Sequence, residues 1–173
     1  MYLDSEGNVT VGIGQLLATP QAAAGLPFRR GALGAPASTP EKLAAWQRVK
    51  SATRATRSEQ RRIGGLELPQ SAIETLFRRR VIEFVSQLRR TFPDFDKYPY
   101  EAQLALLDLA FNTGSVTAKN WPALTAAVRR RDWMVAASQS RRGQVQKSRN
   151  DATFSLFARA AAADSSGVRG VPR

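Results

Sequence analysis

Residues 1–17, MYLDSEGNVTVGIGQLL, have the pattern of a β-hairpin and set the fold at the front of the chain. After the first turn, apolar residues occupy every second position from Val9 to Ile13, which is the spacing of a strand with one buried face. Residues 6–8, Glu-Gly-Asn, have the composition of a three-residue turn, because glycine adopts the dihedral angles that such turns need. The pattern therefore predicts a hairpin over residues 2–14.

The register of this hairpin decides which side chains lie together. With residues 6–8 as the turn, Ser5 lies opposite Val9 and Asp4 lies opposite Thr10. Cross-strand partners have Cβ atoms about 4.5–5.5 Å apart, so a carboxylate and a hydroxyl in these positions could hold one water between them. Such a pair suits a general base that activates water. The alternative is that Asp4 and Thr10 are polar residues on the solvent side of the hairpin.

Helical patterns dominate the rest of the sequence. The pairs Thr19-Pro20 and Thr39-Pro40 have the composition of helix starts, and Pro93 ends the longest periodic stretch. Irregular segments are expected at residues 28–38, which are rich in Gly, Ala and Pro, and at residues 51–65, which are polar and basic. Helices are expected at residues 20–24, from 39 onward, from 69 to the position before Pro93, and at 100–112, 121–130, 132–140 and 150–163.

These elements predict an α+β fold, predominantly α, in a single domain of 173 residues. Residues 1–68 form a small lobe with the hairpin, residues 69–164 form a helical lobe, and a long helix links the two. Residues 165–173 are small and polar and are expected to be a frayed tail. The segment 100–112 is apolar nearly all round, which predicts a central buried helix, with Asp108 as a buried partner for an arginine.

The composition excludes several kinds of catalysis. The chain has no cysteine and no histidine, so Ser-His and Cys-His triads, HExxH zinc chemistry and disulfides are all ruled out. Neither a metal nor another cofactor is expected. Carboxylate chemistry such as glycoside hydrolysis fits the residues that remain. We expect no membrane span, because no apolar run approaches about 18–20 residues, and the first residues lack the pattern of a secretory signal.

The balance of charge is strongly basic. The chain has 26 Lys and Arg against 14 Asp and Glu, a net charge of +12 that attracts polyanions. Residues 78–80, 129–131 and 141–142 are arginine clusters. They are solvated helix faces, contacts to an anionic bacterial envelope, or phosphate contacts to nucleic acid. No aromatic residues are interleaved with them as a stacking platform for single strands, so nucleic acid is the less favoured partner.

The opening stretch also resembles the front hairpin of phage-type lysozymes, whose pattern is Tyr-x-Asp-x-x-Gly-x-x-Thr-x-Gly-x-Gly-x-Leu. Further segments are similar to the family's helices in the same order: ALLDLAFNTG, RRDWMVAA and SRNDATFSLF. Residues 53–65 and the run FPDFDKYPYEAQ are closer to lysozyme-like toxin domains of bacterial secretion-system effectors. The positions of this chain that match the hairpin pattern are Tyr2, Asp4, Gly7, Thr10, Gly12, Gly14 and Leu16.

The resemblance implies a lysozyme-like fold and an N-acetylmuramidase, a glycoside hydrolase that cleaves the glycan strand of peptidoglycan. Asp4 and Thr10 match the catalytic residues that position the attacking water. Arg149 matches a basic residue that partners the catalytic Glu, and Phe111 and Asn112 fall where sugar contacts the floor of the cleft. These three are the expected substrate-binding residues.

The general acid of this family is a Glu that precedes the hairpin Asp by nine residues, which places it upstream of Met1. No Asp or Glu of the chain has a matching motif around it. We therefore expect the parent protein to be a muramidase, and the polypeptide that begins at Met1 to be severely impaired. The competing expectation is a non-catalytic binding module of the same fold, for cell wall or for nucleic acid.

The resemblance also implies where the protein acts. It is made in the cytoplasm and reaches the periplasm or cell wall of a target bacterium after delivery, through a holin, a secretion machine or a delivery domain. Besides peptidoglycan, an immunity or inhibitor protein is an expected partner of a toxin domain of this kind.

Overall fold

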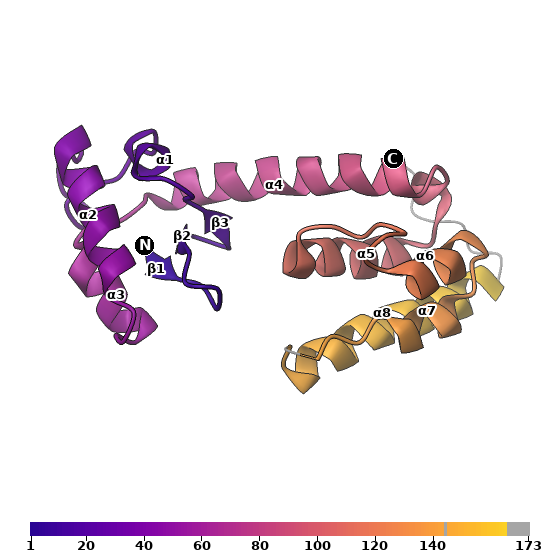
Figure 1. Cartoon of the computed structure of the whole chain (residues 1–173). Coiled ribbons are helices and arrows are strands. Elements are labelled where there is room, and N and C mark those ends of the chain that lie inside the picture. The colour runs from indigo at the N-terminus through magenta and orange to yellow at the C-terminus, as the bar shows by residue number, and fades with distance from the viewer. Residues whose placement is uncertain (144, 166–173) are drawn as a thin grey trace. The chain divides into compact units, whose positions relative to one another are not determined.

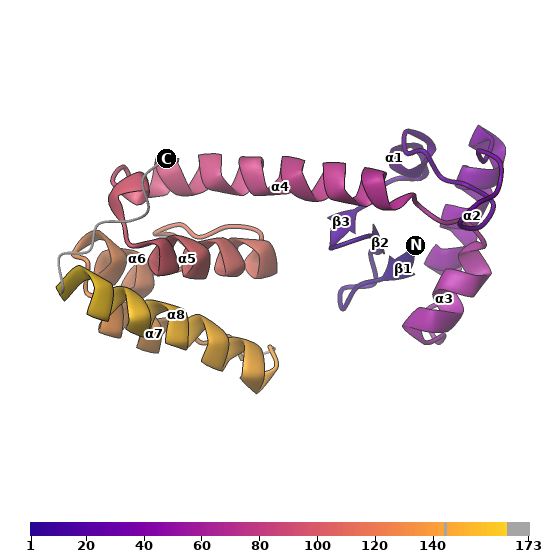
Figure 2. The same cartoon turned by 180° about the vertical axis from the view of Figure 1, so that it is seen from behind.

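The structure, a computed structural model, describes residues 1–143 and 145–165. They fall into two compact units, one from Met1 to Arg80 and one from Val81 onward. The first unit holds a small antiparallel sheet with three helices, and the second is helical (Figures 1 and 2). The predicted α+β class with predominant helix is confirmed. The boundary between the units falls inside a long helix, between Arg80 and Val81.

The sheet of the first unit has three strands, β1 (Tyr2–Leu3), β2 (Val9–Val11) and β3 (Gln15–Leu16), in the order β1-β2-β3. The hairpin predicted over residues 2–14 is therefore the first part of a meander. Gly12 and Gly14 have positive φ angles of 59° and 79° and form the second turn, a conformation that favours glycine. The period-two pattern had placed both glycines in a strand. Ile13 lies at the tip of this turn and is 62% exposed.

The register between β1 and β2 differs from the predicted one. Tyr2 pairs with Thr10 and Leu3 with Val9, so Asp4 lies opposite Asn8, not opposite Thr10. The prediction was wrong because it made residues 6–8 the turn. The turn closes one position earlier on each strand, since the Asp4 side chain binds the turn backbone.

Three helices complete the first unit. They are α1 (Pro20–Ala24), α2 (Thr39–Ser51) and α3 (Arg57–Gly64). The predicted starts of α1 and α2 are confirmed within one residue: Thr19 caps α1, and Ser38 forms a capping box with Glu41 at α2. The buried face of the sheet packs with α2, where the Trp46 indole N–H donates to Leu17 O at 2.8 Å.

Helix α3 corrects the expectation of an irregular segment at residues 51–65. Thr56 and Glu59 form a capping box, with the Thr56 N–H 2.7 Å from a Glu59 carboxylate oxygen. Gly65 ends the helix with φ 67°. Both signals are in the sequence as T-x-x-E and G-G. An irregular segment was predicted because the residues between them are polar and basic. After α3, Glu67 pairs with Arg29 in an isolated antiparallel β-bridge.

Helix α4 (Gln70–Thr91) begins in the first unit and ends in the second. The second unit continues with a 3-10 turn and four helices. Helix α5, predicted to be central and buried, buries one face and packs against α8, which also packs against α7; its buried residues are Ala102, Ala105, Leu106, Leu109 and Ala110. These elements are Phe95–Lys97, α5 (Tyr100–Thr113), α6 (Pro122–Arg129), α7 (Trp133–Gln139) and α8 (Lys147–Ser165).

Of the predicted tail 165–173, Ser165 is the last residue of α8, and residues 166–173 lie outside the described part of the chain. In residues 1–143 and 145–165, no helix combines the length and the apolar character that crossing a membrane requires.

Gln60 joins three parts of the first unit. Its Oε1 accepts the Leu3 N–H at 2.8 Å, and its Nε2 donates to Ala52 O at 3.1 Å and to Ala55 O at 3.0 Å. The residue is 5% exposed, so these groups have little access to water. Gln60 therefore holds β1 against α3 and fixes the connection between α2 and α3.

Replacing Gln60 by leucine is expected to lower the free energy of unfolding by about 1–3 kcal/mol, because a buried N–H and two carbonyls lose their partners. Amide hydrogen exchange at Leu3 should accelerate. Gln70→Leu on the exposed start of α4 is the matched control and should change stability by no more than about 0.5 kcal/mol. Equal effects of the two substitutions would contradict the role given to Gln60.

Candidate active site

Asp4 follows β1 directly, and its carboxylate closes the turn that leads to β2. Oδ1 accepts the N–H of Glu6 at 2.9 Å and the N–H of Asn8 at 2.8 Å. The Asp4 N–H itself donates to Asn8 O at 3.0 Å, which continues the ladder beyond β1. Gly7 supplies the positive φ of the turn, 72°. One oxygen of Asp4 is thus committed to the backbone, and the orientation of the carboxylate is fixed by it.

The other oxygen of Asp4 faces Thr10. Oδ2 lies 3.5 Å from Thr10 Oγ1 and 3.5 Å from Asn8 Nδ2, both at the long end of the hydrogen-bonding range. Each carboxylate oxygen has two lone pairs, so Oδ2 retains capacity to accept a proton donor. The structure brings Asp4 and Thr10 together by a diagonal contact, although they are not the cross-strand partners that the sequence predicted.

The two faces of the sheet differ. Leu3, Val9 and Val11 are buried in the apolar core of the first unit. Tyr2 and Thr10 are direct partners on the opposite face, and Asp4, two residues after Tyr2, follows on that same face. Thr10 is only 3% exposed, so its hydroxyl is held by its surroundings and is not a mobile surface group.

In the second unit, Arg149 binds Asp108 of α5. Its Nε and one terminal nitrogen lie 2.9 Å and 2.7 Å from Asp108 Oδ1. Asp108 Oδ2 accepts from Arg142 at 3.0 Å and from Thr153 Oγ1 at 2.8 Å. The expectation that Asp108 pairs with an arginine is confirmed, and it pairs with two. Arg149, expected to partner a catalytic Glu, has Asp108 as its carboxylate partner in the described residues.

The pKa of Asp108 reflects two opposing causes. Burial by itself raises the pKa of this carboxyl, but the hydrogen bonds from Arg149, Thr153 and Arg142 outweigh it and hold the pKa below its ordinary value. The carboxylate is therefore charged at neutral pH. It cannot act as a general acid, which must carry a proton.

The two other predicted substrate-binding residues lie at the end of α5. Phe111 is half-buried, and its ring meets Phe84 edge to face with centroids 4.9 Å apart. Asn112 is exposed and lies one helical turn after Asp108, on the same face of α5. Phe111 thus has a packing role in this unit, whereas the amide of Asn112 is open to a ligand.

Arg142 is the residue of this region that sequence reasoning placed wrongly. It was grouped with Arg141 as a surface cluster, but Arg142 is 7% exposed while Arg141 is exposed. Asn150 Oδ1 accepts its backbone N–H at 3.1 Å and its Nε at 3.2 Å. Nothing in the local sequence distinguishes these two neighbouring arginines. The available signal was the lone Asp108 in an apolar helix, which needs a buried cation.

Two further carboxylates have structural roles. Glu41 binds Arg30 and the Ser38 N–H and hydroxyl, and these bonds lower its pKa to about 2. The capping contacts with Thr56 lower the pKa of Glu59. Neither has the raised pKa that a general acid needs. In the described part of the chain, no group of three or more carboxylates lies close enough to hold a metal ion.

We compared the chain with protein-family models, with curated proteins and with solved structures, and none of the three comparisons gave a match. The geometry of the site therefore carries the functional argument.

Because the Asp4 carboxylate holds the turn, we expect different outcomes for two substitutions of Asp4. Asp4→Asn keeps a side-chain oxygen for the amides of Glu6 and Asn8 and should change the free energy of unfolding by no more than about 0.5 kcal/mol. Asp4→Ala removes that acceptor and should cost about 1–2 kcal/mol, because the turn is partly exposed and water replaces part of the loss. Urea unfolding of the two variants measures the difference. Equal stability would show that the carboxylate does not hold the turn.

The lowered pKa of Asp108 predicts that the stability of the fold depends on pH. Its folded pKa is depressed, so its contribution is present above the unfolded pKa of about 3.9 and is lost as pH falls through the lower folded value. Asp108→Asn should therefore lower the free energy of unfolding by about 1–3 kcal/mol at pH 7 and by less as the solution becomes more acidic. Urea unfolding at several pH values checks this.

Asp151 provides the control for that experiment. It forms an exposed ion pair with Lys147 on α8, 2.6 Å between the charged atoms. Asp151→Asn should cost no more than about 0.5 kcal/mol, since exposed pairs contribute little. A loss at Asp108 that is independent of pH would contradict the assigned cause.

Proposed function

We propose that this chain belongs to a lysozyme-like glycoside hydrolase, an N-acetylmuramidase that cleaves the glycan strand of peptidoglycan. The observation that carries the proposal is the Asp4 carboxylate, whose Oδ1 is anchored by two backbone amides while Oδ2 lies beside the Thr10 hydroxyl. This is the arrangement that an enzyme needs in order to hold and deprotonate one water. It adds to the resemblance of the hairpin sequence to that of phage-type lysozymes.

In the proposed reaction, a water lies beside the pair of oxygens Asp4 Oδ2 and Thr10 Oγ1, which are 3.5 Å apart, and bonds to both. Asp4 accepts a proton from the water as its oxygen attacks the anomeric carbon of the sugar, and Thr10 orients the water by a second hydrogen bond. The glycosidic bond breaks, and the leaving oxygen receives a proton from a carboxylic acid. In the resembled family this acid is a Glu that precedes the hairpin. For the second unit, the substrate-binding residues that the resemblance implies are Phe111, Asn112 and Arg149.

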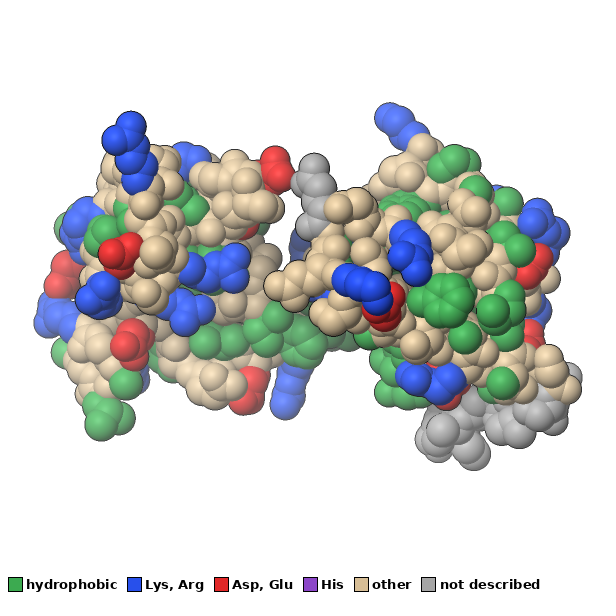
Figure 3. All heavy atoms as spheres, turned by 90° about the horizontal axis from the view of Figure 1, so that it is seen from below, with side chains coloured by type: hydrophobic (Ala, Val, Ile, Leu, Met, Phe, Trp, Pro, Cys, Tyr) green, Lys and Arg blue, Asp and Glu red, His purple; other side chains and the backbone are tan. Residues whose placement is uncertain are grey.

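The proposed setting is bacterial antagonism or lysis, in which the protein is delivered to the periplasm or cell wall of a target bacterium. An immunity or inhibitor protein that covers the site would protect the producing cell. The basic surface suits an anionic envelope: Lys and Arg side chains are spread over both units on the face drawn in Figure 3.

The second candidate function is a non-catalytic binding module for cell wall or nucleic acid. The net charge of +12 favours it. A nucleic-acid module would bind DNA with an affinity that falls steeply with salt. A cell-wall module would bind peptidoglycan without releasing fragments.

The proposal is tested by the release of fragments from purified peptidoglycan. The assay compares the 173-residue chain with an extended form in which a segment carrying a Glu nine residues before Asp4 is added in front of Met1. The extended form should be active, and Asp4→Asn within it should lower turnover by about 10²–10⁴-fold, the range for a general acid–base residue. Glu6→Gln, an exposed carboxylate of the same turn, is the matched control and should leave turnover unchanged. Turnover that survives Asp4→Asn would exclude the proposed mechanism.

A further inference from the structure

One peptide unit in the Asp4 turn has both of its polar groups bound by side chains. It joins Gly7 to Asn8, and its N–H donates to Asp4 Oδ1 at 2.8 Å. Its carbonyl oxygen, Gly7 O, accepts from Lys50 Nζ at 2.7 Å. Because a peptide unit is planar and its N–H and C=O point in opposite directions, the carboxylate and the ammonium hold the same plane from its two ends.

These two bonds restrict a peptide unit that its own residues leave free to rotate. A rotation of the plane changes ψ of Gly7 and φ of Asn8, and glycine and asparagine are the residues that best tolerate unusual values. Gly7 already has a φ of 72°. Within the described residues, apart from its chain neighbours, nothing lies within 4 Å of the place where a Cβ of Gly7 would be. A plane turned over would present an oxygen to Asp4 in place of an N–H.

Lys50 belongs to a part of the chain that also holds the strand before the turn. It lies in the last turn of α2, next to the connection that leads to α3. Gln60 of α3 fixes that connection and accepts the N–H of Leu3, the residue before Asp4. Lys50 and Gln60 therefore hold the chain on both sides of Asp4.

Helix α3 makes a further contact with the same strand. The guanidinium carbons of Arg57 and Arg61 lie 4.8 Å and 5.7 Å from the centre of the Tyr2 ring, within the range of cation–π contacts. Tyr2 is the cross-strand partner of Thr10. The segment from the end of α2 to α3 thus contacts β1 opposite Thr10 as well as the turn that carries Asp4.

The charge of Lys50 adds to its effect on the turn. Hydrogen bonds to a charged group are stronger than those between neutral groups. Bonds that follow one another also polarise one another, so a cation at Gly7 O makes the Asn8 N–H a better donor to Asp4 Oδ1. A neutral side chain at position 50 would lose both effects, whereas an arginine would keep a cation and its donors.

We propose that Lys50 is a positioning residue for Asp4. It holds the peptide unit between Gly7 and Asn8, so that the Asp4 carboxylate keeps Oδ2 beside Thr10. The inference rests on the proposed function, because it names what holds the water-binding oxygen in place. Lys50 acts on Asp4 through the turn and not on the substrate, so its loss affects the chemical step and not the binding of the glycan.

The test measures the cleavage of solubilised glycan strands by the extended form. Lys50→Met should lower kcat by about tenfold, the loss expected when a charge-assisted hydrogen bond no longer orients the base, and should leave KM within about twofold. Lys50→Arg should restore kcat to within about twofold of that of the unsubstituted protein, because it keeps the cation and its donors. Circular dichroism melting checks that each variant is folded.

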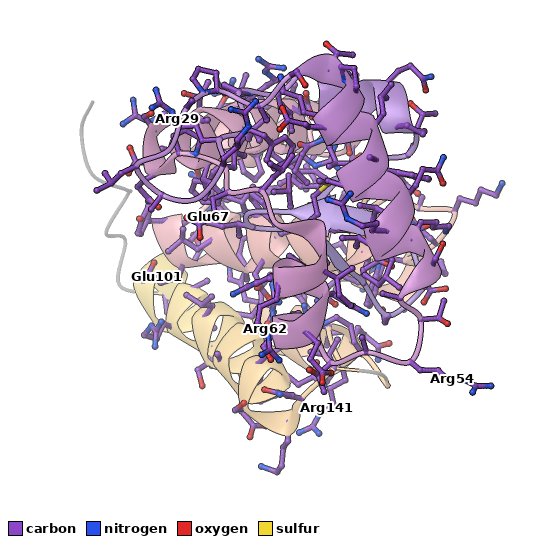
Figure 4. All side chains as sticks on the ribbon, turned by 90° about the vertical axis from the view of Figure 1, so that its left-hand side faces the viewer. Arg29, Arg54, Arg62, Glu67, Glu101 and Arg141 are labelled. Atoms are coloured by element: carbon purple, nitrogen blue, oxygen red, sulfur yellow. The ribbon has the colours of Figure 1, made fainter. Side chains whose placement is uncertain are left out.

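Arg54→Met is the matched control. It also removes one positive charge, from an exposed residue of the connection between α2 and α3 whose side chain points away from the molecule into solvent (Figure 4). It should change kcat and KM by no more than about twofold, because salt screens exposed charges.

Amide hydrogen exchange in the 173-residue chain tests the turn independently of activity. Lys50→Met should accelerate exchange at the Asn8 N–H by about tenfold, because the peptide unit then leaves the Asp4 carboxylate more often. Arg54→Met should leave this exchange unchanged. Unchanged exchange in Lys50→Met would show that Lys50 does not hold the peptide unit.

The activity measurements separate this inference from the proposed function. If Asp4→Asn loses turnover but Lys50→Met has the kcat of Arg54→Met, the inference is overturned and the proposed function stands. If turnover survives Asp4→Asn, the proposed function fails and the positioning role fails with it. An equal rise of KM in Lys50→Met and Arg54→Met, without a fall in kcat, would show a general effect of charge and would also overturn the inference.

Discussion

The bond between the Asp4 carboxylate and the backbone of its own turn is the constraint on which the front of the molecule depends. With Oδ1 held by the amides of Glu6 and Asn8, the register of the sheet is fixed, and a shift by one residue would move every side chain to the other face. The same bond leaves Oδ2 beside Thr10. A single side chain thus shapes the turn with one oxygen and offers the other, oriented, beside Thr10.

In the second unit, a network of several side chains holds a carboxylate in place. Asp108 is the only charged residue of α5 after Glu101, and Arg142 and Arg149 neutralise it while Thr153 completes its hydrogen bonds. Removing one partner would leave a charge in a poorly solvated place, so the members of such a network depend on one another. The network fixes α5 against α8 and holds Arg149 in a defined orientation near Asn112.

The sequence predicted most of the helices, because their signals are local. Thr19-Pro20, Thr39-Pro40 and Pro93 mark boundaries through the chemistry of capping and of the missing proline N–H. The register of the hairpin was not predictable in the same way, since a three-residue turn fits both residues 6–8 and residues 5–7, and only the Asp4 hydrogen bonds choose between these two positions. Helix α3 was missed because most of its residues are polar or basic, and its two buried residues, Gln60 and Gly64, give no apolar periodicity. The burial of Arg142 beside the exposed Arg141 depends on contacts with residues distant in sequence, which no local pattern records.

The central claim is that Asp4 Oδ2 and Thr10 Oγ1 together hold the attacking water. A high-resolution crystal structure of the chain with a bound chitin oligosaccharide tests it most directly. The claim predicts an ordered water within hydrogen-bonding distance of both oxygens, about 2.6–3.2 Å from each. A Thr10 hydroxyl that instead donates directly to Asp4 Oδ2 at about 2.7 Å, with no water between sugar and carboxylate, would contradict it.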